Sequence, residues 1–99
     1  MTYLDRIGEA IRRHIPDDLL PDGDTDQLFR LYAVLTLAKG TDVTAADVHN
    51  AWSAWMQTRN PEHESLRPFE ELDWQRKVAD EPYVEAIRAV SRAHVYKPH

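Results

Sequence analysis

The chain has 99 residues, of which 42% are hydrophobic, and it contains no cysteine, so we expect one domain over residues 1–99 with a modest core and no disulfide or thiolate metal site. Its formal net charge of −5 disfavours binding to nucleic acid, because affinity for a phosphate backbone comes largely from Lys and Arg side chains. No stretch approaches the roughly 20 apolar residues that span a bilayer, and the N-terminus lacks a signal-peptide core, which together predict a cytoplasmic protein that is not bound to a membrane.

A first helix is predicted to begin after Thr2. Asp5 stands three residues later, and this Thr-x-x-acid spacing is typical of a capping box, which satisfies free N–H groups at a helix start. Pro16 is expected to end the helix. Its apolar residues recur at helical spacing and give it one inward face; they are Leu4, Ile7, Ile11 and Ile15.

Residues 16–26 are predicted to form a loop, because they contain two prolines, one glycine and five aspartates. We expect Leu19 and Leu20 to pack down onto the core. Asp24 or Thr25 is expected to cap the following helix.

The alternating aspartates of this loop suggest calcium binding, but the spacing disagrees. Counted from Asp22, the sixth position of a calcium loop needs glycine and the twelfth needs glutamate. The chain has Gln27 and Ala33 at these positions. We therefore predict a solvated turn.

The second predicted helix covers residues 27–39 and is apolar on almost every side. Such a helix is expected at the centre of a bundle, where its neighbours cover it. Gly40 follows directly, and a glycine just past a helix end is typical of a position with positive φ.

The third predicted helix holds two of the three tryptophans. Thr44 and Asp47 form a second capping box, and the helix is expected to run to about Thr58, before Asn60 and Pro61. An inward stripe follows the i, i+3, i+4, i+7 pattern: Val48, Ala51, Trp52 and Trp55. The edge beside the stripe is the candidate site and carries His49, Trp52 and Met56.

Residues 61–73 are polar and irregular apart from a small apolar group, and a loop of this length usually has a function. The apolar residues are Leu66, Pro68, Phe69 and Leu72. A short helical turn is predicted over residues 74–78, and Asp80 is predicted to cap a last helix that has Pro82 in its first turn. No segment alternates with period two, so we predict an all-α fold, a small single-domain bundle of about four helices with a long ordered loop between the third and fourth.

Two stretches resemble the RyR domain, which is repeated in ryanodine receptors and occurs alone in bacterial and phage proteins. His49-Asn-Ala-Trp52 is similar to that family's His-Asn-x-Trp on a helix. Residues 66–72, followed by Lys77 and Asp80, resemble its Leu-x-Pro-aromatic-acid-x-Leu motif with a later Lys and acid. The resemblance covers about residues 44–90.

This resemblance implies a helical module that binds small molecules or partner surfaces, with nucleotide-type ligands suggested for several members. Carried over by position, Trp52 and Phe69 would be the aromatic walls of the site. His49 and Asn50 would be the polar group at the helix start.

The aromatic and arginine side chains in these stretches are chemically suited to a nucleotide-type ligand. A base that stacks on aromatic rings gains about 1–3 kcal/mol. Arg59 lies two helical turns beyond Trp52, and Arg67 lies beside Phe69, so either arginine is suited to donate to a phosphate. The predicted ligand-binding residues are Trp52, Phe69, His49, Asn50, Met56, Arg59 and Arg67.

Structural roles are the alternative for the same residues. A tryptophan in the position of Trp52 is more often a core anchor than a ligand platform, because aromatic side chains dominate small cores, and Trp55 is predicted to be core. His49 is equally suited to hydrogen-bond the long loop and hold Phe69 in place.

Neither catalysis nor metal binding is predicted, and we expect no cofactor. The histidines lack the spacing of a metal site; they are His14, His49, His63, His94 and His99. The chain shows no nucleophile motif, and the acidic residues within 62–71 are expected to be solvated.

We predict a non-enzymatic domain of RyR type that binds or sequesters a nucleotide-derived ligand by aromatic stacking. The alternative is a protein–protein interaction module, either self-associating or with another protein, that uses the same aromatic surface. A helix-turn-helix DNA binder ranks last, because its reading helix has no Lys or Arg between Thr44 and Thr58.

Overall fold

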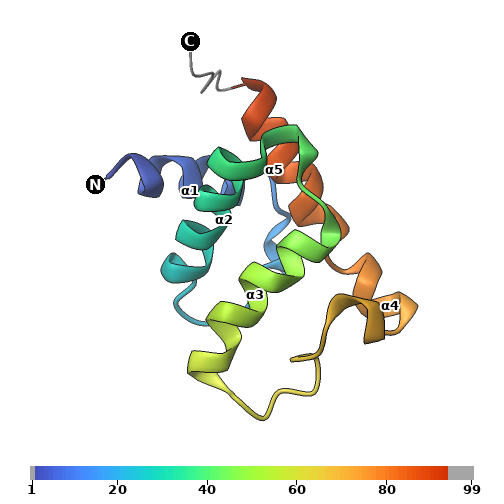
Figure 1. Ribbon diagram of the computed structural model, residues 1–99. Coiled ribbons are helices and arrows are strands. Elements are labelled where there is room, and N and C mark those ends of the chain that lie inside the picture. Colours follow the sequence, from blue (N-terminus) through green and yellow to red (C-terminus); the bar gives the residue numbers. More distant parts are fainter. Residues whose placement is uncertain (1, 94–99) are drawn as a thin grey trace.

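The computed structural model describes residues 2–93, along which five α-helices follow one another (Figure 1). They are α1 (Tyr3–Arg13), α2 (Asp26–Lys39), α3 (Ala45–Arg59), α4 (Trp74–Val78) and α5 (Glu81–Ala93). Three short 3₁₀ turns lie between them, η1 (Asp17–Leu19), η2 (Gly40–Asp42) and η3 (Phe69–Glu71). Residues 2–93 contain no strand. The prediction of an all-α bundle with four main helices is therefore confirmed.

Local sequence sets the starts of two helices. The Thr2 side chain accepts the N–H of Asp5, while the Asp5 carboxylate accepts the N–H of Thr2. Thr44 and Asp47 make the same reciprocal pair at the start of α3. Both predicted capping boxes are confirmed, and each satisfies two backbone N–H groups that a helix start leaves free.

The core forms around α2, which packs against α1, α3 and α5 (Figure 1). The buried side chains come from all four long helices and include Ile7, Ile11, Leu28, Tyr32, Val48, Trp55, Val84, Ile87 and Val90. A Cβ atom on Gly8 would lie 3.1 Å from the carbonyl oxygen of Phe29. The glycine therefore allows α1 to approach the backbone of α2 closely.

One face of α2 is not covered, although its sequence is apolar nearly all round. Val34 is 49% exposed and Leu37 is 43% exposed. The predicted central position of α2 is confirmed, because it packs against α1, α3 and α5, but these neighbours cover only part of its circumference. Leu19 is also 45% exposed and does not pack onto the core, whereas Leu20 does pack against it.

The turn between α2 and α3 depends on Gly40, whose φ is +57°. This is the region of backbone conformation that favours glycine, because a Cβ atom would be strained there. The predicted positive φ just past the helix end is confirmed.

Residues 60–73 form the long loop between α3 and α4 and end in η3, which packs against α3. In Figure 1 this loop leaves the end of α3 at the bottom of the molecule and returns to α4. The loop and α4 thus lie on the side of α3 that carries the predicted site.

Candidate functional site

A cavity of about 240 Å³ lies where the long loop, α4 and the start of α5 meet α3. Five separate parts of the chain contribute its walls. The lining residues are Leu19, Pro21, Tyr32, His49, Trp52, Ser65, Leu72, Arg76, Ala79, Asp80 and Tyr83. Apolar walls with a few polar groups are typical of small-molecule sites.

Asp80 directly precedes α5 and lines this cavity, and its side chain does not cap the helix. A capping side chain usually accepts the N–H of the second or third helical residue. The second residue is Pro82, which has no N–H, and the N–H of the third, Tyr83, donates to the Asp80 carbonyl oxygen at 3.1 Å. The prediction that the Asp80 side chain caps α5 is therefore wrong.

The freed carboxylate of Asp80 is costly to the fold. Its Oδ2 atom is buried and has no hydrogen-bond partner within residues 2–93. Burial raises the pKa of Asp80 to about 6; the nearby His49 opposes this shift, and the charge of Glu81 adds to it. Near pH 7 the carboxyl is consequently mostly ionised but poorly solvated.

Two tyrosines bring a neutral aromatic wall to the carboxylate. The rings of Tyr32 and Tyr83 lie 5.3 Å apart between centroids. Burial raises the pKa of Tyr83 to about 12, and the charge of Asp80 adds to the rise. Burial likewise raises the pKa of Tyr32 well above its ordinary value. Both phenols therefore stay protonated over the physiological range.

A hydrogen bond holds this wall in place. The Tyr83 hydroxyl donates to the carbonyl oxygen of Leu19 at 2.7 Å. These residues are 64 positions apart, so the bond ties η1 to α5 and keeps Leu19 at the cavity although its side chain is partly exposed.

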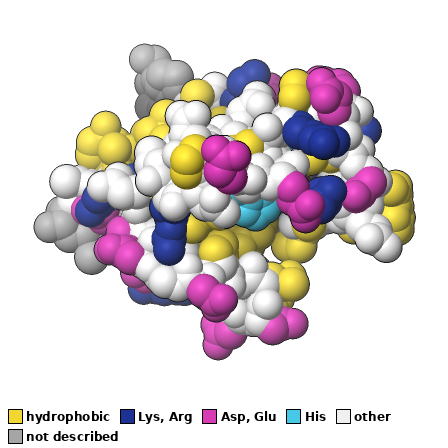
Figure 2. Space-filling view, turned by 90° about the horizontal axis from the view of Figure 1, so that it is seen from below, with side chains coloured by type: hydrophobic (Ala, Val, Ile, Leu, Met, Phe, Trp, Pro, Cys, Tyr) yellow, Lys and Arg dark blue, Asp and Glu magenta, His cyan; other side chains and the backbone are white. Residues whose placement is uncertain are grey.

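Trp52 forms the opposite wall and is held between two histidines. Its ring stacks on His49, with centroids 5.6 Å apart, and meets the edge of His63 at 5.0 Å. The N–H of Ser65 donates to His63 Nδ1 at 3.0 Å, which fixes the second histidine in the loop. Figure 2 shows the face that is underneath in Figure 1, where histidine atoms lie among hydrophobic ones and charged side chains surround them.

His49 connects α3 to the long loop. Its Nε2 lies 2.6 Å from the carbonyl oxygen of Arg67, and since a carbonyl only accepts, Nε2 carries the proton and donates. The ring also faces Phe69, with centroids 6.2 Å apart. The alternative that His49 hydrogen-bonds the loop and packs against Phe69 is confirmed.

Arg76 is the cationic residue in the cavity lining, and acidic neighbours already occupy it. Its guanidinium donates to Asp73 at 3.2 Å and to Glu64 at 2.6 Å. It therefore supplies the cavity with little uncompensated positive charge.

The sequence of the chain matches one known protein family. A family model described as a domain of unknown function, DUF7701, matches residues 2–92. The chain belongs to this family. Searches of curated proteins and of solved structures gave no match.

Membership of the DUF7701 family contradicts the resemblance to the RyR domain, because the matching model is not that of an RyR domain. The motifs that carried the resemblance describe local structure. His49-Asn-Ala-Trp52 is one turn of α3, and residues 66–72 are a loop that ends in a 3₁₀ turn. Short segments of this kind form in helical domains of unrelated ancestry, so they did not identify the family.

The DUF7701 domain gathers two of the seven predicted ligand-binding residues, His49 and Trp52, in the cavity lining. Arg59 lies elsewhere, because it donates to the carbonyl oxygen of Asp24 at 2.8 Å and stacks on Trp55 with its guanidinium carbon 4.5 Å from the ring centroid. Arg59 therefore does not line the cavity beside Trp52. A seven-residue step returns to nearly the same face of a helix, but a long side chain follows its own partners.

The other predicted residues surround the cavity without lining it. Phe69 is partly buried and packs on His49, with the Lys77 ammonium 5.4 Å from its ring centroid. Met56 packs against the core. Asn50 and Arg67 are exposed, and Arg67 takes part through its backbone carbonyl alone.

Sequence reasoning missed the polar groups that distinguish the cavity. The sequence pattern marks Tyr32 only as part of the apolar helix predicted over residues 27–39, and no motif singles out Tyr83 or Arg76. The sequence did indicate that the Asp80 side chain is free of a capping role. Pro82 lies two residues after it, and a proline there lacks one of the N–H groups that a capping side chain would accept. No comparable signal places Tyr32 and Tyr83 together, since they lie in different helices.

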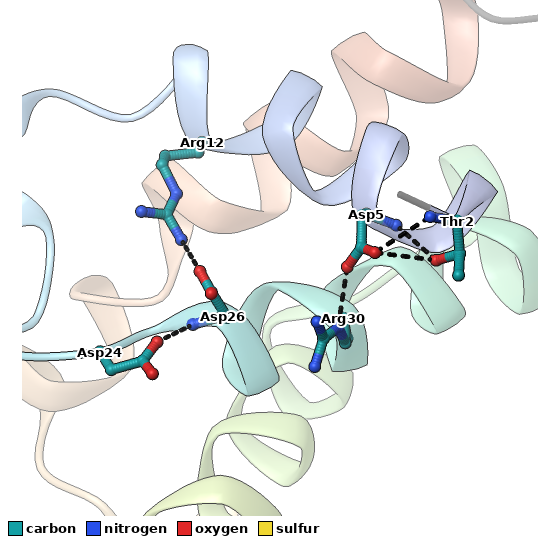
Figure 3. A network of polar contacts seen from close by, with 6 residues as sticks. All are labelled: Thr2, Asp5, Arg12, Asp24, Asp26 and Arg30. Atoms are coloured by element: carbon teal, nitrogen blue, oxygen red, sulfur yellow. Dashed lines mark hydrogen bonds and ion pairs between the residues drawn. The ribbon is translucent and has the colours of Figure 1, made fainter.

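A second hollow, of about 260 Å³, lies between α1 and α2 and is a poorer candidate site. Its charged groups already pair with one another (Figure 3), since Arg30 donates to Asp5 at 2.8 Å and Arg12 to Asp26 at 3.3 Å. Thr25 is the N-cap residue of α2 but its side chain makes no cap bond, whereas Asp24 accepts the N–H of Asp26, the first residue of the helix, at 3.0 Å. A ligand would have to displace these bonds.

The described residues were also compared with what a metal site and a membrane-spanning helix require. Within residues 2–93, no group of three or more His, Asp or Glu side chains is placed to hold a metal ion. His94 and His99 lie outside the residues that the structure describes. Along the same part of the chain, no helix has the length and apolar character to cross a membrane.

Proposed function

We propose that this DUF7701 domain is a non-enzymatic module that binds a compact small molecule in the cavity between α3, the long loop and α5. One observation carries the proposal: the Oδ2 atom of Asp80 is buried in the cavity lining without a hydrogen-bond partner within residues 2–93. Buried polar atoms are almost always paired, and an exception calls for an explanation. Three other side-chain atoms within residues 2–93 are also buried without a partner, on Arg12, Arg88 and Ser91, but none of these residues lines this cavity. A ligand that donates a hydrogen bond to Asp80 supplies that explanation.

The size of the cavity limits the ligand. Its volume of about 240 Å³ is below the roughly 300–1,000 Å³ of pockets that hold drug-sized molecules. Trp52 offers the ligand an aromatic wall whose position His49 and His63 fix. A single planar or apolar ring system with polar substituents fits these limits.

A nucleobase is one planar ligand that this proposal includes. The phosphate contacts expected from the sequence do not support a whole nucleotide, because Arg59 is bonded to Asp24 and stacked on Trp55. Arg76, the cation in the lining, is paired with Asp73 and Glu64. The proposal therefore concerns the ring and its hydrogen-bond donors, without a phosphate clamp.

The test is to fill the cavity and ask whether binding disappears. The native full-length protein is first examined by native mass spectrometry for a co-purifying molecule, and then screened by thermal denaturation against nucleosides, amines and aromatic metabolites. Ligands found in this way should no longer bind Ala79→Leu, because Ala79 lines the cavity. The matched control is Ala54→Leu on the exposed side of α3, which should bind as the wild type does. Binding that survives Ala79→Leu unchanged would refute the proposed site.

Protein–protein interaction is the second candidate, and a separate observation favours it. Trp74 is 75% exposed and Val78 is 41% exposed, and their four-residue spacing puts both on one side of α4. Exposed aromatic and apolar side chains that lie together are typical of interaction surfaces. Sedimentation of the wild type and of Trp74→Ala tests self-association: a concentration-dependent dimer that the substitution abolishes would support this candidate.

A further inference from the structure

We infer that the ligand of the cavity carries a protonated nitrogen, as an ammonium, amidinium or guanidinium group joined to a compact apolar or planar body. This inference rests on the proposed function and adds the charge and chemical class of the ligand. It follows from the charges that face the cavity and from the side chains that already have partners.

The cavity holds one negative group without a partner. Asp80 Oδ2 is buried and accepts no hydrogen bond from any residue between 2 and 93. The backbone around it is already bonded, because the Asp80 carbonyl oxygen accepts the N–H groups of Tyr83 and Val84, both at 3.1 Å. Asp80 as a whole is only partly buried and lines the cavity, so its carboxylate is the anionic acceptor beside a ligand, and a charged donor forms a stronger bond to it than a neutral one.

The positive groups nearby are engaged elsewhere. Arg76 is held by two acidic side chains, Glu64 at 2.6 Å and Asp73 at 3.2 Å. His49 donates its Nε2 proton to the loop carbonyl of Arg67. A ligand cation therefore has no strong competitor for the carboxylate within the cavity lining.

The aromatic walls favour the same charge. Tyr32, Tyr83 and Trp52 all line the cavity, and the two tyrosines stay protonated because burial raises the pKa of each. Aromatic rings attract a cation that approaches their faces, most strongly where it has lost its water. Tyr32 is only 1% exposed and Tyr83 7%, so the partly buried Trp52 offers most of the accessible ring surface, and together with the carboxylate it is a suitable environment for an organic cation.

The same features disfavour an anion. A phosphate or carboxylate ligand would meet the charge of Asp80 at close range, and like charges in a poorly solvated site repel strongly. The nearest guanidinium, on Arg76, would have to abandon Glu64 or Asp73 to neutralise it.

Three probes of nearly identical shape separate charge from fit. Benzamidine is cationic, benzamide is neutral and benzoate is anionic, and each is a single ring small enough for the cavity. Isothermal titration of the full chain at pH 7.5 should show saturable binding of benzamidine. Benzamide should bind at least about tenfold more weakly, and benzoate should not bind measurably.

Matched variants assign the preference to Asp80. Asp80→Asn keeps the side-chain shape but removes the charge, and it should reduce the affinity for benzamidine at least about tenfold, close to that for benzamide. Asp42→Asn removes one exposed charge and lies outside the cavity lining, so its affinity should stay within about twofold of the wild type. Trp52→Phe should weaken both probes and leave their ratio nearly unchanged.

A pH series adds a readout that a purely structural role of Asp80 would not move. Benzamidine keeps its charge between pH 5 and 7.5, whereas Asp80, facing His49, Tyr83, Arg76 and neighbouring Glu81, loses most of its charge near pH 5 because burial raises its pKa to about 6. Binding should therefore be about tenfold weaker at pH 5 than at pH 7.5. In Asp80→Asn this pH dependence should disappear.

The outcomes separate this inference from the proposed function. If benzamide or benzoate binds as tightly as benzamidine, or if Asp80→Asn retains the preference, the ligand is not selected as a cation, while the cavity remains a binding site. If no cationic probe binds but a neutral metabolite does so in a manner that Ala79→Leu abolishes, the inference is overturned and the proposed function stands. If nothing binds the cavity, both are refuted.

Discussion

Asp80→Asn should increase the stability of the protein at neutral pH, which is an unusual outcome for a substitution at a buried position. The wild-type carboxylate is ionised and buried, and its Oδ2 lacks a hydrogen-bond partner within residues 2–93. An amide of the same shape removes the charge and with it most of the desolvation cost. The prediction therefore tests whether the carboxylate is as strained electrostatically as the geometry indicates.

The magnitude follows from the pKa of Asp80, which burial raises to about 6 from an unfolded value of about 3.9. A difference of about two units corresponds to at most about 3 kcal/mol. Solvent screens part of this because Asp80 is not fully buried, so we expect about 1–2 kcal/mol. In a domain of this size that is an increase of the melting temperature by about 5–15 °C.

The stability gained on replacing Asp80 by Asn depends on pH. Because the folded pKa is above the unfolded one, the folded protein binds the extra proton between about pH 6 and pH 4, and the cost is relieved as the pH falls through this window. The gain from Asp80→Asn should thus be nearly full at pH 7.5, about half near pH 5 and about a fifth at pH 4.2. Asp5 does not disturb this window, because its hydrogen bonds with Arg30 and Thr2 lower its pKa to about 2, and its stabilising effect is lost only as the pH falls below about 4.

Urea denaturation of the wild type, Asp80→Asn and Asp42→Asn, followed by circular dichroism at these three pH values, measures the effect. Asp42 is exposed, so Asp42→Asn should differ little from the wild type at every pH. If Asp80→Asn is less stable than the wild type at pH 7.5, or equally altered at all three values, then the carboxylate has a bonding partner and the reasoning about the cavity fails.

Four further outcomes are expected. His49→Phe should lose about 1–3 kcal/mol of unfolding free energy in urea, because the partly buried hydrogen bond from His49 to the Arg67 carbonyl is lost; an unchanged midpoint would show that this bond does not hold the loop. Arg59→Ala should lower stability by about 1 kcal/mol and leave ligand affinity in titrations unchanged, whereas a lost affinity would return Arg59 to the site. Gly40→Ala should cost about 1–2 kcal/mol in thermal unfolding because φ is +57° there, and a neutral effect would mean that the turn can relax. Short DNA duplexes should not shift in a gel near physiological salt, since the net charge is −5; salt-sensitive binding would contradict this.

The sequence predicted those parts of the fold that depend on neighbouring residues. The capping box of Thr44 and Asp47, the positive φ of Gly40 and the bounds of α4 all require only a few adjacent positions. Each is set by backbone geometry and local hydrogen bonds, which a short pattern specifies. These predictions were therefore correct without knowledge of the tertiary structure.

The site depended instead on pairs of residues that are distant in the sequence. Arg59 meets Asp24 across 35 positions, and the Tyr32 and Tyr83 rings meet from different helices. Helical periodicity says which face a residue occupies but not which partner its side chain finds. The position of Trp52 in the cavity lining was predictable from its helix, whereas the neighbours that define the chemistry were not.

The hydrogen bonds around the cavity support the proposal that Asp80 binds a ligand. The walls around it are fixed by bonds that are satisfied within the domain, from Tyr83 to Leu19 and from His49 to the loop. In such a well-satisfied setting a buried carboxylate oxygen without a partner conflicts with the rule that governs its neighbours. Sequences tend to break local rules of this kind at functional sites, where the cost in stability is offset by binding. If a cation binds Asp80, it should stabilise the wild type increasingly as its concentration exceeds the Kd, whereas Asp80→Asn, which has lost the charge that attracts the cation, should gain little from the same ligand.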